Sequence, residues 1–445
     1  MHDQSRNGST YPEWIHEVKA DGYRQGKARS PSCNDIRFGW RLLDFDAQEE
    51  MVRARMRPEP DGPVQEVQAR YLVGADGARS LVRKALGIGW DGGTGARRDF
   101  MGGQMFAVHL RAPGFYDAVP HDRAWMYVAV NHERRAFICS IDGGSEFVFH
   151  AALHDGESAQ WDAEDARRLF AQALGRQLDI EVLAMGMWTA GHSLVAQAFG
   201  RGRVLLAGDA AHLFTPTGGL GYNTAVEDAV NLGWKLASVI QGVAPAALLD
   251  SYEVERKPLA LRNTAYARRF ADSVGLFPAS AALEQDGAEA ESERRRASEY
   301  LNAHVRLEFN IPGVTFGCRY DASPVIVGDG TTPPLDQANA YEPSACPGGR
   351  PPHAWLDDGR SLYDSFHTEW TLLVLGPRPP ATEPFVLAAH ELGLDLRVVS
   401  HASAQLRDLY QASLALLRPD QVVAWRGADA QGAAAVLRQV LARAA

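Results

Sequence analysis

Cysteine is scarce in this sequence. The 445 residues include only four cysteines, which are widely spaced and form no C-x-x-C pair: Cys33, Cys139, Cys318 and Cys346. This usage indicates neither a disulfide framework nor a zinc site, and it fits a reducing compartment. We therefore expect a cytoplasmic protein without a bound metal.

Long apolar runs and an excess of positive charge are also missing. No run approaches the about 18 apolar residues that a membrane-spanning helix needs, and the polar start does not resemble a secretory signal. The formal net charge of −10 argues against nucleic acid or an anionic membrane as the main partner. With 46% hydrophobic and 22% charged residues, the composition is that of a globular protein, and the length allows two or three domains.

The most informative stretch is 202–242. Its apolar run 204–207 is typical of a buried parallel strand, and Gly208-Asp209 turns the chain where open α/β sheets bind their ligands. A loop with Pro216 and three glycines then leads into a helix from about Tyr222. The glycines are Gly218, Gly219 and Gly221, and the apolar residues at helical spacing are Ala225, Val226, Ala229, Leu232, Leu236 and Val239.

This strand, loop and helix suit an anionic, planar ligand. Glycines let the backbone approach a ligand closely, and a helix N-terminus offers free N–H groups with about half a positive charge. Asp209 does not favour a phosphate but accepts hydrogen bonds from sugar hydroxyls, so the combination fits a flavin. The alternative is that the glycines serve only close packing between the strand and the helix.

A second turn motif occupies 73–80. A predicted strand leads into Asp76-Gly77, and a helix follows from about Ser80, which is a suitable N-cap residue. Asp-Gly by itself is a common turn dipeptide. Its position between a strand and a helix, upstream of Gly208-Asp209, makes both turns more credible as parts of one ligand site.

Together, the two stretches resemble the flavin motifs of the single-component aromatic hydroxylases. These are flavoprotein monooxygenases resembling para-hydroxybenzoate hydroxylase and phenol hydroxylase. The resemblance covers about 36–445 and is strongest at 70–83 and 202–258. It implies an oxidoreductase with a Rossmann-like FAD-binding domain, with FAD as cofactor and NADPH or NADH as co-substrate.

The resemblance also implies roles for individual residues. Asp209 matches a residue that contacts the sugar-like part of FAD, and Tyr222 and Asn223 match residues whose backbone amides hold the pyrimidine edge of the flavin. Pro216 matches a residue beside the substrate, where its backbone would help to polarise a substrate hydroxyl; no other catalytic group is assigned. The expected cofactor-binding residues are Asp76, Gly77, Arg79, Gly208, Asp209, Pro216, Gly218, Gly219, Gly221, Tyr222 and Asn223.

Between the motifs, 93–195 predicts mostly strands and turns, which fits an antiparallel sheet inserted into the flavin domain. The resemblance places the substrate sheet here, facing the flavin ring. Trp125 and Tyr127 share one face of a predicted strand by period two, and they are candidates for the wall of an aromatic pocket. Core packing is the favoured alternative for both rings. For His212, which follows the Gly-Asp turn, we expect a structural role.

A helix is predicted to continue over 247–270. Its segment 251–258 also resembles the family, although the charged residues Glu255 and Arg256 would equally fit a solvated helix face. From about His353, strands near 370–375, 394–400 and 421–425 alternate with helices, as in a small α/β domain. Its position resembles the thioredoxin-like C-terminal domain of phenol hydroxylase relatives.

The C-terminal unit has no cysteine after Cys346, which excludes thiol redox chemistry there. Packing or dimerisation is therefore its expected role, and a homodimer is left open. The expected domains are a partial FAD-binding domain (1–92), a substrate-binding sheet (93–195), the continued FAD-binding domain (196–327), a linker (328–352) and a thioredoxin-like domain (353–445).

One family feature is absent from the sequence. The family opens with a strand, a G-x-G-x-x-G turn and a helix that binds the FAD pyrophosphate, and no such pattern occurs before residue 70. The resemblance therefore implies an N-terminally truncated FAD-binding domain. A misplaced start codon, a truncated gene and weak FAD binding all remain open as explanations.

The activity implied by the resemblance is hydroxylation of a phenolic or other small aromatic substrate by oxygen. In that family NADPH or NADH reduces FAD, and a flavin C4a-hydroperoxide transfers one oxygen atom to the ring. Two alternatives stay open. One is a halogenase or reductase of the same fold, and the other is a non-catalytic remnant or partner-binding protein, which the missing glycine turn favours.

Overall fold

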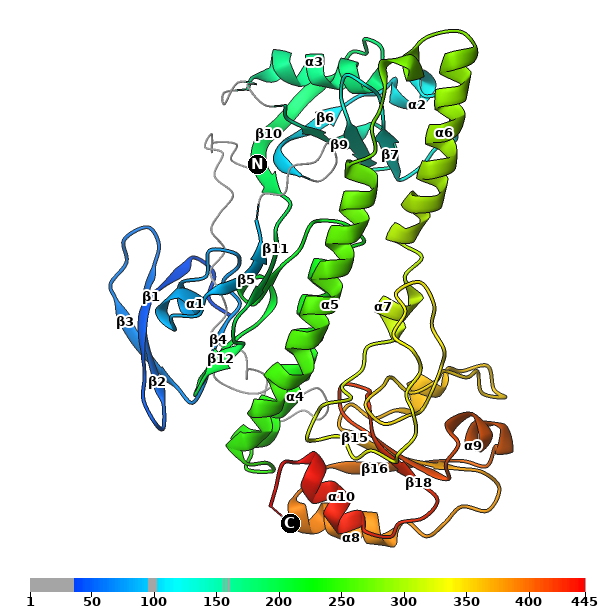
Figure 1. The fold of residues 1–445 in the computed structure, drawn as a ribbon. Helices are drawn as coiled ribbons and strands as arrows, with labels where there is room; N and C mark the ends of the chain where they lie inside the picture. Colours follow the sequence, from blue (N-terminus) through cyan, green and yellow to red (C-terminus); the bar gives the residue numbers. More distant parts are fainter. Residues whose placement is uncertain (1–35, 95–101, 155–156, 158–160, 445) are drawn as a thin grey trace.

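A computed structural model describes residues 36–94, 102–154, 157 and 161–444. The long helix α5 (Asp250–Gly275) runs through the centre of the molecule. An antiparallel sheet lies near one end of this helix, a C-terminal α/β unit lies near the other, and three small sheets of the described chain lie to its side (Figure 1). This mixed α/β architecture agrees with the fold class that the sequence predicts.

The two strands that carry the predicted turns lie side by side. β4 (Leu72–Gly74) pairs in parallel with β13 (Val204–Leu206), so that Gly74 lies opposite Leu206. All of β13 is buried, as its apolar sequence predicts. β12 (Gly200–Arg201) extends this sheet, and a separate antiparallel sheet is formed by β1 (Trp40–Ala47), β2 (Val52–Pro58) and β3 (Gln65–Ala69).

A five-stranded antiparallel sheet interrupts the sequence between β4 and β13, with strand order β10-β6-β9-β8-β7. Its strands are β6 (Gly103–Arg111), β7 (Met126–Ala129), β8 (Ala136–Ser140), β9 (Glu146–Ala152) and β10 (Glu181–Ala190). The short helix α2 (Phe115–Ala118) and the helix α3 (Ala163–Leu174) complete one buried core, in which Phe170 contacts Phe149. On the other face of the sheet, Phe270 and Val274 of α5 belong to a separate buried cluster that includes Met105 and Phe137. This confirms the antiparallel sheet expected between the two motifs.

The segments that lead into and out of the five-stranded sheet lie side by side. β5 (Trp90–Gly93) precedes the sheet and β11 (Ser193–Ala196) follows it, and these two strands pair with each other in antiparallel fashion. β14 (His212–Leu213) then pairs with the other edge of β11. The return strand therefore connects directly to the segment that follows the Gly-Asp turn.

Between the Gly-Asp turn and the C-terminal unit, the described chain forms the helices α4 (Leu220–Ile240), α5, α6 (Ala288–Val305) and α7 (Pro312–Phe316). The 3-10 turns are η1 (Gly208–Ala210), η2 (Ala246–Leu249), η3 (Ala281–Glu284) and η4 (Arg306–Glu308). α4 confirms the predicted helix, but its buried side is more polar than the apolar spacing indicates. Asp228, Asn231 and Lys235 are fully buried on α4, while Val226 is 44% exposed.

The C-terminal unit contains a mixed four-stranded sheet with order β16-β15-β17-β18. Its elements are η5 (Leu362–Ser365), β15 (Trp370–Leu375), α8 (Glu383–Leu392), β16 (Leu396–His401), α9 (Ala404–Tyr410), β17 (Leu414–Leu417), β18 (Val423–Gly427) and α10 (Ala433–Val440). The predicted strands and helices are present. The sequence analysis missed only β17, which is short and buried along its whole length. Within the described chain, 328–352 contains no helix or strand.

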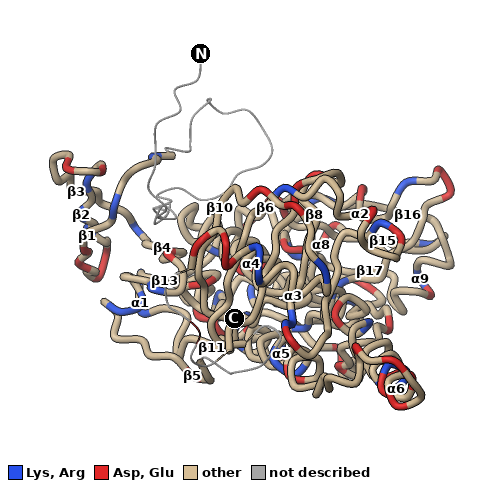
Figure 2. Tube along the Cα trace, turned by 90° about the horizontal axis from the view of Figure 1, so that it is seen from above, with Lys and Arg blue, Asp and Glu red and all other residues tan. Residues whose placement is uncertain are grey.

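Charged residues of both signs occur throughout the described part of the molecule (Figure 2). Figure 2 shows basic and acidic residues interspersed along the described chain, with both signs on α6. Among the described residues, none of the helices has the length and apolar character needed to cross a membrane.

Candidate functional site

The two predicted turns meet at one edge of the β4–β13 sheet. The backbone N–H of Ala207 donates to the carbonyl oxygen of Gly74 at 3.0 Å, and Gly74 pairs with Leu206 in the parallel ladder. Both strands end here, at the edge where α/β sheets bind ligands. The structure therefore brings together two motifs that lie about 130 residues apart in the sequence, as the resemblance implies.

Gly208 requires a backbone conformation that other residues rarely adopt. Its φ is +59°, and a Cβ atom at this position would lie 3.2 Å from the Cβ atom of Ala225 on α4. A glycine here lets the turn pack closely on α4. The turn is consequently held in one geometry, with Asp209 directly after it.

Asp209 presents its carboxylate to solvent directly after the turn. Its side chain is exposed to solvent, and it makes no hydrogen bond or ion pair with another described residue. The surrounding protein partly desolvates the carboxyl group and raises its pKa, an effect that His212 opposes. A carboxylate in this state is a ready acceptor for hydroxyl groups of a ligand.

The glycine-rich loop ends in an uncapped helix N-terminus. Gly218 and Gly219 adopt left-handed φ values of +65° and +64°, and Gly219 is the N-cap residue of α4 without a side-chain hydrogen bond. The first turn of α4 contains no acidic residue. Gly221 and the 79% exposed Tyr222 lie in this turn. Its N–H groups are therefore available for an anionic or carbonyl-rich ligand edge.

Two threonines fix the loop around Pro216. Thr215 donates its hydroxyl to the carbonyl oxygen of His192, and Thr217 donates to that of Ala267, each at 3.1 Å. Both threonines are buried, whereas Pro216 between them is exposed. The loop thus presents Pro216 outward from a rigid base. Asn223, one turn into α4, donates its side-chain amide to the carbonyl oxygen of Gly219 at 2.8 Å.

The Asp-Gly turn builds the start of α1 (Leu81–Ala85). Asp76 accepts hydrogen bonds from the Ser80 hydroxyl and from the backbone N–H of Val82, the latter at 3.0 Å. Ser80 is the N-cap, as predicted. Gly77 has a φ of +73° and open space around it, and Arg79 is exposed. Asp76 therefore shapes this turn, while Gly77 and Arg79 remain open to a ligand.

The aromatic pair expected on one strand face is divided by the structure. Tyr127 lies in β7, packs edge-to-face on Phe115 at 5.2 Å between ring centroids, and donates its hydroxyl to the Asp122 carbonyl oxygen at 3.0 Å. Tyr127 therefore packs against the core of the sheet, which was the alternative interpretation. Trp125 precedes β7, is 63% exposed, and meets the exposed ring of Phe309 at 6.5 Å. The expected shared face was wrong because Trp125 lies outside the regular strand.

Glu308 is a site residue that the sequence analysis missed. It lies in η4, is only 6% exposed, and accepts a hydrogen bond from the backbone N–H of Gly218 at 3.1 Å. Burial raises the pKa of this carboxyl group, against the opposing effect of the Gly218 N–H. Its electrostatic interaction with Cys139 of β8 places it between the glycine-rich loop and the antiparallel sheet. No sequence pattern marks this residue.

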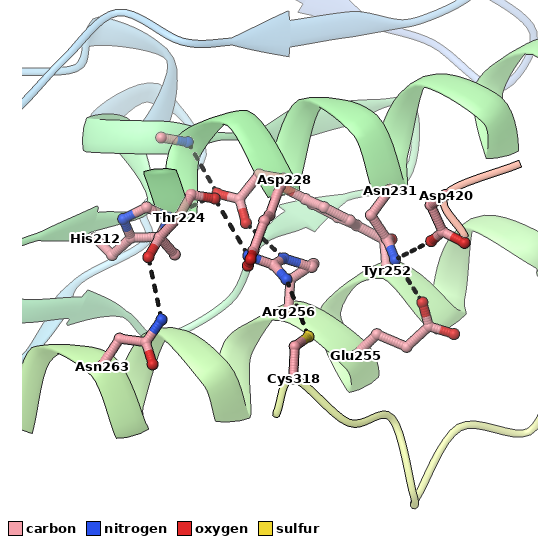
Figure 3. A network of polar contacts seen from close by, with 12 residues as sticks. His212, Thr224, Asp228, Asn231, Tyr252, Glu255, Arg256, Asn263, Cys318 and Asp420 are labelled. Carbon is pink, nitrogen blue, oxygen red and sulfur yellow. Dashed lines mark hydrogen bonds and ion pairs between the residues drawn. The ribbon is translucent and has the colours of Figure 1, made fainter. Parts of the chain in front are cut away.

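A buried polar network holds the Gly-Asp turn from behind (Figure 3). Asp228 of α4 accepts from the backbone N–H of Gly208 at 3.1 Å, and the same oxygen lies 2.6 Å from Nε2 of His212. Its other oxygen accepts from Nε of Arg256 at 2.8 Å. His212, Asp228 and Arg256 are all fully buried. His212 is therefore structural, as expected, whereas Arg256 is a core residue and not a solvated helix charge.

Polar residues at helical spacing were the available signal for this network. Asp228, Asn231 and Lys235 follow one another by three and four residues on α4, and Glu255 and Arg256 lie in the segment that resembles the family. Opposite charges on two adjacent helices are compatible with a solvated surface as well as with a buried cluster. In the structure these five side chains are buried.

The described residues fit a flavin dinucleotide. The unpartnered carboxylate of Asp209 suits hydroxyl donors, and the uncapped N-terminus of α4 suits an electron-rich ring edge. The left-handed Gly77 and Gly219 leave space beside the backbone, because no atom lies within 4 Å of a Cβ placed at Gly77, and only the Asn223 amide approaches one at Gly219, at 3.8 Å. These observations agree with the ligand that the sequence predicts.

Two family models match the chain. The model described as "FAD binding domain" matches residues 11–267, and the model described as "Aromatic-ring hydroxylase, C-terminal" matches residues 344–445. The first covers the glycine-rich site, and the second covers the C-terminal α/β unit. The two models thus account for most of the sequence.

Curated relatives match over nearly the whole chain. The FAD-dependent monooxygenase opdD of Penicillium oxalicum is 29% identical over 99% of this chain and 87% of its own length. The tetracenomycin B2 monooxygenase-dioxygenase of Streptomyces olivaceus is 33% identical over 98% of this chain and 77% of its own length.

Solved structures of similar proteins share the fold. The rebeccamycin biosynthetic enzyme RebC with reduced flavin has a TM-score of 0.79 and 31% identity, and the match covers 91% of this chain and 74% of RebC. The complex of aklavinone-11 hydroxylase with FAD and aklavinone has a TM-score of 0.75 and 30% identity, over 92% of this chain and 75% of that chain.

Proposed function

Because the chain belongs to the FAD-dependent aromatic-ring hydroxylase family of monooxygenases, we propose that it hydroxylates a phenolic ring of a fused polycyclic substrate and binds FAD at the Gly208-Asp209 turn. The observation that carries the proposal is the unpartnered Asp209 carboxylate beside the uncapped N-terminus of α4. The substrate class is suggested by relatives whose names describe polyketide and aklavinone hydroxylases.

Each part of the site has one task. Asp209 would accept hydrogen bonds from the ribityl hydroxyls of FAD, and the N–H groups around Tyr222 and Asn223 would bind the pyrimidine edge of the flavin. Gly77 and Arg79 would bind near its pyrophosphate. Bound FAD, reduced by NADPH or NADH, supplies the activation of oxygen for transfer of one oxygen atom to the ring.

The substrate side lies between the glycine-rich loop and the antiparallel sheet. The exposed rings of Trp125 and Phe309, which meet edge-to-face, offer an apolar contact for a polycyclic ring system. Pro216 points outward from the loop, where its carbonyl oxygen would accept a hydrogen bond from a substrate hydroxyl. Glu308 provides the one buried carboxyl group that lies against both the loop and the sheet among the described residues.

The finer domain assignment also belongs to this proposal. The C-terminal elements follow the order strand, helix, strand, helix, two strands, helix, with β15 parallel to β16 and antiparallel to β17. This topology supports a thioredoxin-like domain with a packing role. The domain limits at 92, 195, 327 and 352, and a homodimer, are proposals that limited proteolysis and light scattering test.

A non-catalytic flavin- or partner-binding protein is the second candidate. It is favoured by the position of β4, which in the described chain is a sheet edge that pairs only with β13. Such a protein would bind FAD or a partner without consuming NADPH in the presence of phenols.

The deciding experiment combines flavin retention with turnover. The full chain is expressed with added FAD, desalted, and examined for bound flavin, and NADPH and NADH oxidation is then measured with simple phenols and with hydroxylated anthraquinones. Retained flavin with substrate-dependent oxidation and incorporation of one atom from labelled oxygen supports the proposal. Retained flavin without product formation supports the second candidate.

Asp209→Ala tests the site itself. A hydrogen bond to a charged group contributes about 1.5–3 kcal/mol, so this variant should bind FAD roughly ten- to a hundredfold more weakly. Arg201→Ala is the control, because Arg201 is exposed in β12 near the same sheet. FAD affinity, measured by fluorescence titration, should be unchanged in that control. Equal affinities for the wild type and Asp209→Ala would reject the assignment of this turn.

A further inference from the structure

Arg418 reaches from the C-terminal domain into the core of the flavin half. It lies just after β17, and its guanidinium group is fully buried. Nη1 and Nη2 donate to the two carboxylate oxygens of Glu255 on α5, at 2.6 and 2.8 Å. This bidentate ion pair joins two residues that are 163 positions apart in the sequence.

Glu255 is the centre of a larger buried cluster. It also accepts from Nζ of Lys235, the side-chain amide of Asn231 and the hydroxyl of Ser323, each at 2.6 Å. Burial opposes the ionisation of Glu255, but Arg418 and Lys235 outweigh it and hold its pKa well below the usual value. Asp420 pairs with Arg418 at 2.5 Å, so the cluster contains two charges of each sign.

The next residue on α5 connects this cluster to the flavin turn. Arg256 follows Glu255 directly and donates to Asp228, which in turn accepts from the backbone N–H of Gly208. In Figure 3, Asp228 and Asn231 of α4 lie near Glu255 and Arg256 of α5, and Asp420 approaches Asn231 from the loop after β17. Movement of Glu255 therefore displaces the helix turn that holds Arg256 against Asp228.

A second connection passes through Tyr320. Its hydroxyl accepts from Nη1 of Arg256 at 3.2 Å, and the Arg418 guanidinium lies over its ring, 5.1 Å from the centroid. Tyr320 is 5% exposed. Arg418 thus contacts both Glu255 and Tyr320, and each of these supports the position of Arg256.

Stability alone is a weak explanation for this arrangement. Burying several charges costs desolvation energy, and apolar side chains of similar volume often stabilise a core as well or better. What the charges add is fixed geometry, because a guanidinium fork accepts a carboxylate in only a few orientations.

We propose that Arg418 is a positioning residue of the flavin site, through which the C-terminal domain fixes the Gly208-Asp209 turn. The inference rests on the proposed binding of FAD at this turn. It assigns the C-terminal domain a part in cofactor binding that acts through Glu255 and Arg256 of α5.

The test uses the full chain and a charge-balanced variant. Arg418→Met with Asp420→Asn removes one charge of each sign and leaves Lys235 to pair with Glu255. Arg443→Met is the matched control, because Arg443 also crosses between the domains, donating to the carbonyl oxygens of Val243 and Gly242 at 2.9 and 3.0 Å. These contacts lie beyond the C-terminal end of α4, far along the helix from Gly208.

Hydrogen exchange of the peptide 204–213 in protein without FAD is the first measurement. Faster exchange in Arg418→Met/Asp420→Asn than in Arg443→Met supports the proposal, and equal exchange in the two overturns it. If the double variant does not fold, the same measurement is made on Arg418→Lys. This variant keeps the positive charge but lacks the guanidinium group that forms two parallel hydrogen bonds with Glu255. Faster exchange at 204–213 in Arg418→Lys than in Arg443→Met then supports the proposal, and wild-type exchange overturns it.

FAD titration is the second measurement, because a purely structural role would lower stability without changing affinity at matched folded fractions. A coupling of ordinary size predicts about tenfold weaker FAD binding in the double variant and wild-type affinity in Arg443→Met. Unchanged affinity in the double variant, with weaker binding in Asp209→Ala, would reject the role of Arg418 and leave the flavin site in place. Unchanged affinity in Asp209→Ala would instead reject the site.

Discussion

Glu308 lies where η4, the glycine-rich loop and β8 meet, and its carboxyl group has one hydrogen-bond donor, the Gly218 N–H, among the described residues. Because burial raises its pKa, the folded protein binds this proton more tightly than the unfolded chain. The folded state therefore loses stability as the pH rises above about 4.5, the ordinary value for glutamate.

Glu308→Gln should remove this loss, because its amide oxygen still accepts from Gly218 and does not ionise. The variant should be more stable than the wild type at pH 7, and the difference should shrink as the pH falls toward 4.5. Urea unfolding across this range measures the difference. Glu299→Gln serves as the control because Glu299 is exposed on α6. A constant difference over the range would contradict the assignment.

His150 gives a prediction of opposite sign. Nδ1 accepts from the Trp188 indole N–H at 3.1 Å and the ring stacks on Phe137, while burial lowers its pKa from 6.5 to about 4. The unfolded chain binds the proton first as the pH falls, so stability is complete above pH 6.5 and is lost toward pH 4, by at most about 1.4 kcal/mol per pH unit.

His150→Gln should flatten the unfolding free energy between pH 6.5 and 4. The exposed His154, four residues later, supplies the control, and His154→Gln should keep the wild-type slope. Chemical denaturation at several pH values in this window provides both slopes. Equal slopes for the wild type and His150→Gln would show that another group is responsible.

At the scale of elements, two glycines, one just before α4 and one inside it, have opposite backbone requirements. Gly218, just before the helix, has a φ of +65° and would place a Cβ atom 3.0 Å from the Glu308 carbonyl oxygen. Gly233, in the helix interior, has no atom within 4 Å of such a Cβ. Gly218→Ala should therefore destabilise the protein by about 1–2 kcal/mol, and Gly233→Ala should stabilise it by roughly 0.5–1 kcal/mol. Thermal unfolding of the two variants gives the comparison.

The predictable elements were those with a strong local signal. The buried strand at 204–206 and the turn after it follow from an apolar run and glycines, and Ser80 follows from the capping preference of serine. β17 was missed because four apolar residues are equally compatible with other buried structure. The fully buried Asp228 and Glu255 were not predictable, since their burial depends on partners from other elements.

At the scale of the whole molecule, the flavin half and the C-terminal domain share one core. A single cluster of buried residues includes Val204 and Leu232 as well as Leu372 and Leu416, and Trp234 meets Trp370 edge-to-face at 5.7 Å. We expect the two parts to unfold together in one transition. Tryptophan fluorescence and circular dichroism should give coincident urea curves, and separate midpoints would contradict a shared core.

The pairing of β5 with β11 bears on how such proteins diversify. These strands bring the two ends of the intervening sheet together, with Gly93 opposite Ser193. Exchange of everything between them for the matching segment of a relative would leave both flavin turns in place. The segment between β5 and β11 can therefore be exchanged as a unit, and chimeras joined at these two strands offer a direct way to transfer the substrate preference of a relative.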